Sequence, residues 1–154
     1  MIVDPTTTMP SPHSHDPYRN FRFRVEIAGL VSAGFTDVEI GASVVEVVEY
    51  REGIDQAIRK LPGLHKTGDV TLKRGVTSSQ ELVQWFRSVV NGDAGFRKDV
   101  AIIVLGEDGT TEVARFLVLQ AWPRRFVIGD LHAKGNEVLI ETIELVNEGI
   151  ERVG

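Results

Sequence analysis

The side chains of this sequence that could catalyse a reaction or bind a metal ion are its histidines and carboxylates. The histidines are few, and neither group forms a recognisable catalytic or metal-binding pattern. His13 and His15 form a His-x-His pair that could offer two imidazoles to a metal ion, but both lie in a segment rich in Pro, Thr and Ser. His65 and His132 have no nearby Ser or Asp pattern of the kind that builds a catalytic triad. We therefore expect no functional metal site and no catalytic histidine.

The acidic residues do not form an acid/base pair by local geometry. Glu141 and Glu144 are three residues apart, and in a strand this spacing places two side chains on opposite faces. The glycine-rich, nucleophile and zinc-binding signatures of common enzymes are missing, and no cysteine is present to supply a thiol nucleophile, a zinc ligand or a disulfide. The sequence thus predicts a protein that is not an enzyme and uses no cofactor, with a hydrolase of dispersed carboxylates as a minor alternative.

Length and composition are those of one globular domain. The chain has 154 residues, of which 42% are hydrophobic and 25% are charged, enough to form one core. Its net charge of -5 argues against nucleic-acid binding driven by overall charge, and no apolar run approaches the roughly 20 residues that span a membrane. We expect residues 1–17, rich in proline and without the pattern of a secretory signal peptide, to be a flexible arm, and residues 18–154 to form the domain.

Alternating apolar and polar residues predict a mainly β fold. Residues 21–27 alternate phenylalanine, valine and isoleucine with arginine and glutamate, which is the period of a strand with one buried face. Asp108-Gly109 is typical of a tight hairpin turn, and Pro123 is expected to end the strand that precedes it. Further strands are predicted at residues 43–50, 69–74, 99–105, 112–122 and 137–146.

One amphipathic helix is predicted at about residues 79–91. Ser78-x-x-Glu81 resembles a capping box, Asn91-Gly92 is a typical helix end, and four apolar side chains recur at helical spacing: Leu82, Trp85, Phe86 and Val89. Because the strands mostly connect without helices between them, their sheets should be antiparallel or mixed. We expect a mainly β (α+β) fold, an antiparallel or mixed β-sandwich or partly open barrel with this helix at one end or face.

A long polar stretch follows the second predicted strand. Residues 51–67 contain Gly53, Pro62 and Gly63 and are predicted to form a loop that is unusually long for a compact domain. Basic residues outnumber acidic ones from 51 to 74, whereas residues 25–50 and those from 136 onward are mainly acidic. Two interpretations stay open: ordinary surface polarity, or self-complementarity in which the basic loop of one copy contacts acidic surface on another.

Several short motifs between residues 16 and 150 occur in the order found in one family of structural proteins. As an ordered set they resemble the inner tube proteins of contractile tails, the group that includes contractile phage tail tubes and extracellular contractile injection systems. The chain is similar, more distantly, to the tube protein of type VI secretion. The motifs are Asp16–Val25 (DPYRNFRFRV), Tyr50–Gly53 (YREG), Lys60–Gly63 (KLPG), Thr71–Gly75 (TLKRG), Trp85, Ala121–Pro123 (AWP), Gly135–Val138 (GNEV), Glu141 and Glu148-Gly149.

The resemblance implies a structural role in a ring-forming subunit. Six copies would form a ring, and stacked rings would form a rigid hollow tube inside a sheath that drives the tube through a target envelope when it contracts. The implied partners are other copies of the chain, the sheath protein, baseplate and tube-terminating proteins, and cargo in the lumen, without nucleic-acid specificity or membrane insertion by this chain alone. The tube would assemble in the cytoplasm and end up in a phage tail or phage-tail-like particle.

The resemblance also implies that the segment between the second and third predicted strands reaches a neighbouring subunit or ring. An alternative of another class is a monomeric β-barrel or sandwich that binds a ligand, such as a flavin-type split barrel, because such modules have this size. The candidate contact residues of the loop are Arg51, Glu52, Gly53, Arg59, Lys60, Pro62, Gly63 and Lys66, and the acidic positions they would meet are Glu46, Glu49 and Glu148.

Overall fold

Nine strands and one helix make up the described part of the chain. The computed structural model describes residues 22–30, 34–54, 56–129 and 138–154. The described residues do not include the N-terminal segment 1–17, which was predicted to be flexible, nor the His-x-His pair within it, nor His132. In chain order the elements are β1 (Arg22–Ile27), β2 (Asp37–Ile40), β3 (Ser43–Tyr50), β4 (Arg59–Thr67), β5 (Val70–Gly75), α1 (Glu81–Val90), β6 (Lys98–Leu105), β7 (Glu112–Ile128), β8 (Ile140–Val146) and β9 (Gly149–Arg152).

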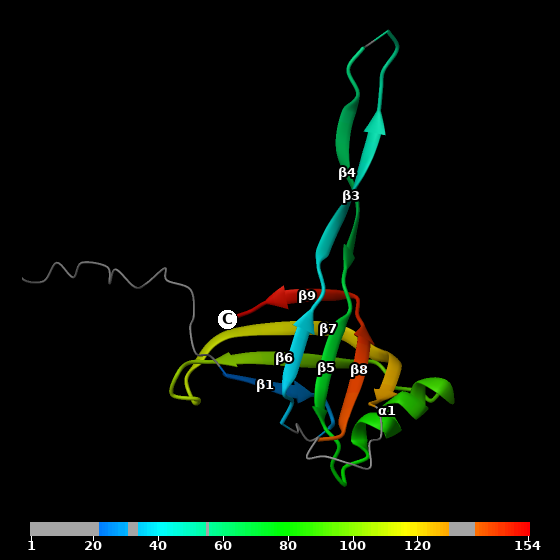
Figure 1. The fold of residues 1–154 in the computed structure, drawn as a ribbon. Helices are drawn as coiled ribbons and strands as arrows, with labels where there is room; N and C mark the ends of the chain where they lie inside the picture. The colour runs from blue at the N-terminus through cyan, green and yellow to red at the C-terminus, as the bar shows by residue number, and fades with distance from the viewer. Residues whose placement is uncertain (1–21, 31–33, 55, 130–137) are drawn as a thin grey trace, which may run out of the picture.

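Most strands form two antiparallel layers that share one long strand. Their pairing follows the path β1-β6-β7-β8-β5-β2, with β9 added along β7, and every pair on it is antiparallel. In Figure 1, β1, β6 and β9 lie across β5 and β8, so the two layers cross. The prediction of a mainly β, antiparallel sandwich or partly open barrel with one helix is confirmed.

Strand β7 belongs to both layers. Its first part, residues 112–121, pairs with β6, and residues 122–128 pair with β8. The change occurs beside Gln120, whose φ is 50° and whose backbone N–H donates a hydrogen bond of 3.0 Å to the Asp99 carboxylate. The predicted strand end at Pro123 is therefore wrong. Proline is tolerated there because the β7–β8 register shifts immediately after it, and prolines within sheets occur at such irregularities.

The core lies between the two layers. Alternate residues of β5 and β8 point inward, and Val70, Leu72, Ile143 and Leu145 have no exposed surface. They form one cluster with residues of β1, β6 and β7 and with Trp85 of α1. Leu82 and Trp85 of the predicted helical stripe are therefore part of the core, whereas Phe86 and Val89 are half-buried. The indole N–H of Trp85 donates to the carbonyl of Phe96 at 2.6 Å, which satisfies its polar atom.

The start of helix α1 differs from the prediction. Its N-cap is Gln80, which makes no side-chain cap hydrogen bond, so the predicted capping box at Ser78-x-x-Glu81 is wrong. Ser78 lies two positions before the N-cap. The hydroxyl of Ser79 lies nearer to the first turn and accepts the backbone N–H of Glu81, at 3.5 Å.

The end of helix α1 is confirmed. Asn91 is the C-cap, and Gly92 has a φ of 71°, a conformation that favours glycine. The backbone N–H of Gly92 donates to the carbonyl of Val89, and that of Asp93 donates to Ser88. These two bonds satisfy carbonyls of the last turn in the arrangement known as a Schellman motif.

The predicted loop at 51–67 is wrong over its second half. Residues 59–67 are strand β4, which pairs with β3 in a separate two-stranded sheet, so β3, β4 and the turn between them form a long hairpin. Pro62 and Gly63 suggested a loop because both usually end strands. In this hairpin β4 has a sheet neighbour on one side. Pro62 pairs with Val47 next to the register shift, which leaves Gly63 and Leu64 opposite Glu46, so neither Pro62 nor Gly63 prevents pairing.

Candidate assembly interface

The hairpin of residues 43–67, which we call the arm, projects from the rest of the chain, which we call the body (Figure 1). All eight residues of β3 are exposed, and so are all residues of β4 except Thr67. At about 3.3 Å per residue, β3 alone extends roughly 26 Å. Large apolar side chains on the arm with at least a third of their surface exposed are Val44, Val45, Val47, Val48, Tyr50, Ile54, Ile58, Leu61 and Leu64.

A bulge in the middle of the arm includes Gly63. The register shifts between Val45 and Val47, so that two residues of β4 lie opposite Glu46. A Cβ atom on Gly63 would lie 2.9 Å from a methyl carbon of Val48 and 3.2 Å from the carbonyl oxygen of Glu46. Such contacts are tighter than side chains normally make, so a residue larger than glycine here would force Val48 and the neighbouring backbone to shift.

Charged residues predicted to meet across subunits face one another within one arm. The Lys66 ammonium lies 2.6 Å from the Glu46 carboxylate, and that hydrogen bond, together with the charge of the carboxylate, raises the pKa of Lys66. Glu49 lies directly opposite Lys60 in the register. Glu46 therefore has an intramolecular partner, and Glu49 has a cation opposite it, so the predicted pairing of the loop with acidic residues of another copy has an alternative within one arm.

The tip of the arm combines charge with exposed apolar side chains. It carries three of the predicted contact residues, Arg51, Glu52 and Gly53, and the last has a φ of 49°. Ile54 beside them is fully exposed, and Ile58 is 60% exposed. The sequence analysis did not identify these two isoleucines, although an isoleucine next to glycine in a polar turn is itself unusual and was a usable signal.

At the root of the arm, where the hairpin joins the body, the outgoing and returning backbones come into contact at Gly41 and Gly68. The backbone N–H of Gly41 donates to the carbonyl of Asp69, and that of Gly68 donates to Ala42, each at 2.9 Å. A Cβ atom on Gly41 would lie 2.8 Å from the Cα of Gly68, and a Cβ atom on Gly68 would lie 2.7 Å from Gly41. The two backbones thus touch where the arm leaves the body, and neither position has room for a side chain.

Asn147 fastens this crossing to the body. Its side-chain amide donates to the carbonyl of Gly68 at 2.9 Å, and its side-chain oxygen accepts the hydroxyl of Thr67 at 2.6 Å. The next residue is Glu148, the third predicted acidic partner, which lies in the body and binds Leu119 through its backbone N–H. Glu148 is therefore near the root of its own arm and far along the chain from Glu46.

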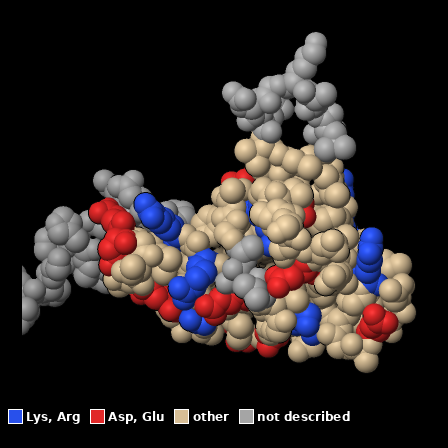
Figure 2. All heavy atoms as spheres, turned by 90° about the horizontal axis from the view of Figure 1, so that it is seen from below, with Lys and Arg blue, Asp and Glu red and all other residues tan. Residues whose placement is uncertain are grey.

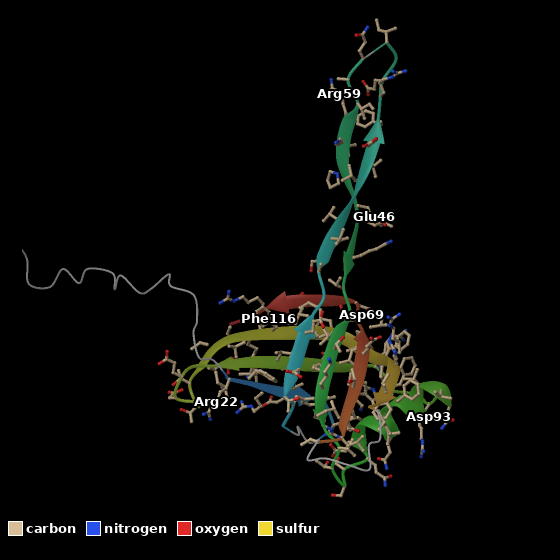
Figure 3. The ribbon with its side chains drawn as sticks, viewed as in Figure 1. Arg22, Glu46, Arg59, Asp69, Asp93 and Phe116 are labelled. Atoms are coloured by element: carbon tan, nitrogen blue, oxygen red, sulfur yellow. The ribbon has the colours of Figure 1, made fainter. Side chains whose placement is uncertain are left out.

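An ion-pair chain continues from the root across the surface of the body. The Arg124 guanidinium lies 2.9 Å from the Asp69 carboxylate and 3.3 Å from Glu144, and Arg125 lies 3.5 Å from Glu144. All four side chains keep some exposure to solvent, so each pair contributes little to stability alone. Together with Asn147 they connect β5, β7 and β8 beneath the arm (Figure 3 labels Asp69).

A buried ion pair that the sequence analysis missed lies within the body. The guanidinium of Arg74 on β5 contacts the carboxylate of Glu141 on β8, and both side chains are almost fully buried. Arg74 also lies 5.7 Å from the ring centroid of Phe35. The signal was available, because each residue occupies an inward position in an otherwise apolar alternation. A single internal pair of this kind has a structural role.

The described residues offer little else for chemistry. Within them, no three His, Asp or Glu side chains converge as a metal site would require, and no helix among them is long and apolar enough to span a membrane. Figure 2 views the end opposite the arm, where basic and acidic side chains are intermingled on the visible surface. That face lacks the continuous basic patch typical of nucleic-acid binding.

Comparisons with known proteins identify the family. Residues 19–151 match the family described as T4-like virus tail tube protein gp19. The chain is similar to one in the PVC sheath–tube complex of an extracellular contractile injection system in the extended state, with a TM-score of 0.79, 24% sequence identity, and 91% of this chain and 93% of that chain covered. It is similar to one in the baseplate of the anti-feeding prophage, 6-fold symmetrised, with a TM-score of 0.73, 26% identity, and 95% and 98% covered.

A more distant likeness extends to Hcp1 from Flavobacterium johnsoniae, with a TM-score of 0.57, 16% identity, and 86% of this chain and 94% of that chain covered. The comparison with curated proteins finds no match. The family match covers nearly the whole described body and the arm, and the likenesses share its fold over almost their full length. The chain therefore belongs to the T4-like virus tail tube protein gp19 family and is a structural protein of a contractile tail tube.

Proposed function

We propose that this chain is the protomer of a hexameric ring and that such rings stack into the rigid inner tube of a contractile injection system or phage tail. The arm is the observation that carries the proposal. A two-stranded hairpin is marginally stable in water, and this one contacts its own body at the root and exposes apolar side chains beyond it. Its apolar surface therefore favours association with another copy.

The free strand edges of the body support assembly around a ring. Within the described residues, β1, β2 and β9 each pair on one side, and unpaired backbone groups at such edges can bond to another chain. We propose that neighbouring bodies pair edge to edge within a ring and that the arm reaches the next subunit or ring. Head-to-tail contacts between rings do not close on themselves, so the stack grows as a filament.

The proposed partners follow from where the similar chains were solved. These include a sheath–tube complex, a sheath/tube terminator, a 6-fold symmetrised baseplate and a tube-terminating cap. They support sheath, baseplate and terminating proteins as partners, and six copies in a ring. We further propose that the tube assembles in the cytoplasm, becomes part of a phage tail or phage-tail-like particle, and carries cargo in its lumen when the sheath drives it through a target envelope.

The decisive experiment removes the arm above its root. Replacing residues 44–66 by a short Gly-Ser linker leaves both root glycines and Asn147 in place. We expect this variant to keep the circular dichroism spectrum and unfolding transition of a folded body. In negative-stain electron micrographs the unchanged chain should form rings and long tubes, and the variant should form no long tubes.

A matched control replaces residues 107–110, the exposed β6–β7 turn, by glycine and serine and should still form tubes. Long tubes from the variant without the arm would contradict the proposal. The ligand-binding alternative is not favoured by the family match. It predicts a monomer with a bound chromophore in size-exclusion chromatography, which the same samples test.

A further inference from the structure

The two strands at the ends of the sheet path flank an apolar hollow in the body, which we call the slot. Within the described residues, β1 pairs with β6 and β2 pairs with β5, each on one side. The slot has a volume of about 290 Å³. Its apolar lining comes from β1, β2, β6 and β7 and consists of Phe23, Val38, Ile40, Ile102, Val104 and Phe116.

The lining of the slot is mainly apolar but more exposed than the core. Phe23, Val38 and Phe116 pack against the core but stay partly exposed, and Ile40 at the rim is 38% exposed. Thr36 and Asp37 are the polar residues at its edge. Covering such exposed apolar surface with another apolar group is favourable, so the slot has the chemistry to accept an apolar side chain.

The same chain offers a matching apolar group at the tip of the arm. Ile54 is fully exposed and Ile58 is 60% exposed. The arm points away from the body (Figure 1), so the tip is far from the slot of its own copy. Each copy therefore has one slot and one apolar tip that can meet only between copies.

Charge favours the same match. The rim of the slot includes one exposed carboxylate, that of Asp37 at the start of β2. The tip of the arm presents the exposed cation Arg51, next to Glu52. Opposite charges around an apolar contact direct the approach and select the register of two surfaces. The β1 side carries Arg24, which already lies 3.2 Å from Glu26 and so adds little repulsion.

We propose that the slot receives the arm tip of another copy, with Ile54 as the side chain that enters it. The inference rests on the proposed tube function and deepens it by naming the receiving surface. One tip and one slot per copy give a head-to-tail contact, which forms an open stack when it joins one ring to the next. The contact between tip and slot then fixes the position of each subunit relative to the next one.

The absence of cysteine from the chain allows a clean cross-linking test. One protein carries Ile54→Cys and a second carries Ile40→Cys, and both sites are exposed enough to tolerate the change. The two are co-assembled with unchanged chain and oxidised, and disulfide-linked peptides are quantified by mass spectrometry. The control replaces Ile40→Cys by Asp93→Cys, an exposed site after α1 (labelled in Figure 3). We expect at least ten times more cross-link to residue 40 than to residue 93.

Tubes that form with equal cross-linking to residues 40 and 93 would overturn the slot and leave the tube function standing. If Ile40→Cys cross-links instead to Met9→Cys in the N-terminal segment, that segment is the occupant and the slot proposal is wrong. If the unchanged chain forms no rings or tubes, the proposed function fails and the slot fails with it. A small molecule that copurifies with the chain and is displaced by Ile40→Trp would also overturn the proposal.

A second variant pair tests the tip without touching the body. Ile54→Asp should reduce tube length at least tenfold, whereas Ile54→Leu should keep it, because leucine retains the apolar contact. Gln56→Asp places the same charge on another exposed residue of the tip and should leave tube length within twofold. Equal loss with both aspartates would show that charge alone is harmful and would overturn the role of Ile54.

Discussion

The body and the arm are built from the same kind of strand, yet their apolar residues have different environments. In β5, alternate residues are buried, because the strand has a neighbour on each side and a second layer over one face. In β3, which contains four valines, every residue is exposed, because the strand has β4 as its partner and no layer above it. Apolar strand residues in this chain therefore serve two surfaces, one buried inside the subunit and one that we propose is buried between subunits.

Ion pairs show the same contrast. Arg74 and Glu141 lie in the body with side chains 2% and 7% exposed, whereas Lys66 and Glu46 lie on the arm with side chains 67% and 44% exposed. A buried pair leaves a costly unpaired charge when one partner is removed, and an exposed pair leaves a solvated one. Substitutions in matched positions can therefore test how far the two regions differ.

The largest effect is expected at the buried ion pair. Glu141→Ala leaves the Arg74 guanidinium buried without its carboxylate and should lower the free energy of unfolding by about 3–5 kcal/mol, measured by urea denaturation. Glu46→Ala makes the matching change on the arm and should leave the urea midpoint unchanged. Equal midpoints for the two variants would show that the body pair is not desolvated as the structure indicates.

Apolar truncation should follow the same division. Leu72→Ala opens a cavity in the core and should cost about 2–5 kcal/mol of unfolding free energy, again from urea denaturation of unassembled protein. Leu64→Ala removes the same atoms from the exposed arm and should stay within about 0.5 kcal/mol. A large loss with Leu64→Ala would mean that the arm already packs against something in the single subunit.

A smaller effect is expected at the root. Asn147→Ala removes the hydrogen bonds to Thr67 and Gly68 and should cost about 1–3 kcal/mol. It should also broaden the orientations of the arm, measured as spin-label distances between Leu61→Cys and Asp93→Cys in unassembled protein. Glu148→Ala, one residue along, is the control and should leave that distance distribution unchanged. An equally narrow distribution in both variants would show that the root glycines alone set the direction of the arm.

The smallest effect on stability is expected at the bulge. Gly63→Ala places a methyl group 2.9 Å from Val48 and should shift the NMR signals of β3 and β4 while leaving those of the body unchanged. Adding Val48→Ala to this variant frees the space and should return the arm signals toward their original positions. If the double variant stays as perturbed as the single one, the contact with the Glu46 carbonyl is the limiting one.

Strands with one buried face could be predicted from the sequence, because packing inside the domain favours an apolar residue at every second position. The first strand of the arm was also predicted, at residues 43–50, and is confirmed as β3. The second strand, β4, was not, since Pro62 and Gly63 end strands in a full sheet but are tolerated in a hairpin with one-sided pairing. β2 and β9 are four residues each, too short for alternation to be recognised. The candidate contact residues of the loop were proposed with the help of the family motifs. The slot could not be predicted, because it depends on β1 and β2 lying at the two ends of the sheet path, and the sequence pattern does not show the order of strands in a sheet. For the same reason Ile54 was not singled out, since its proposed role depends on the slot.

Strand β7 has a mechanical consequence. Because it pairs with β6 along one half and with β8 along the other, the two layers are joined by an unbroken polypeptide as well as by packing. A mechanical force applied to one layer is transmitted to the other through the covalent backbone of β7. The hydrogen bonds that β7 makes with β6 and β8 then experience a shear force. Under compression the wall of such a subunit should yield as one piece, with no plane along which its layers slide apart.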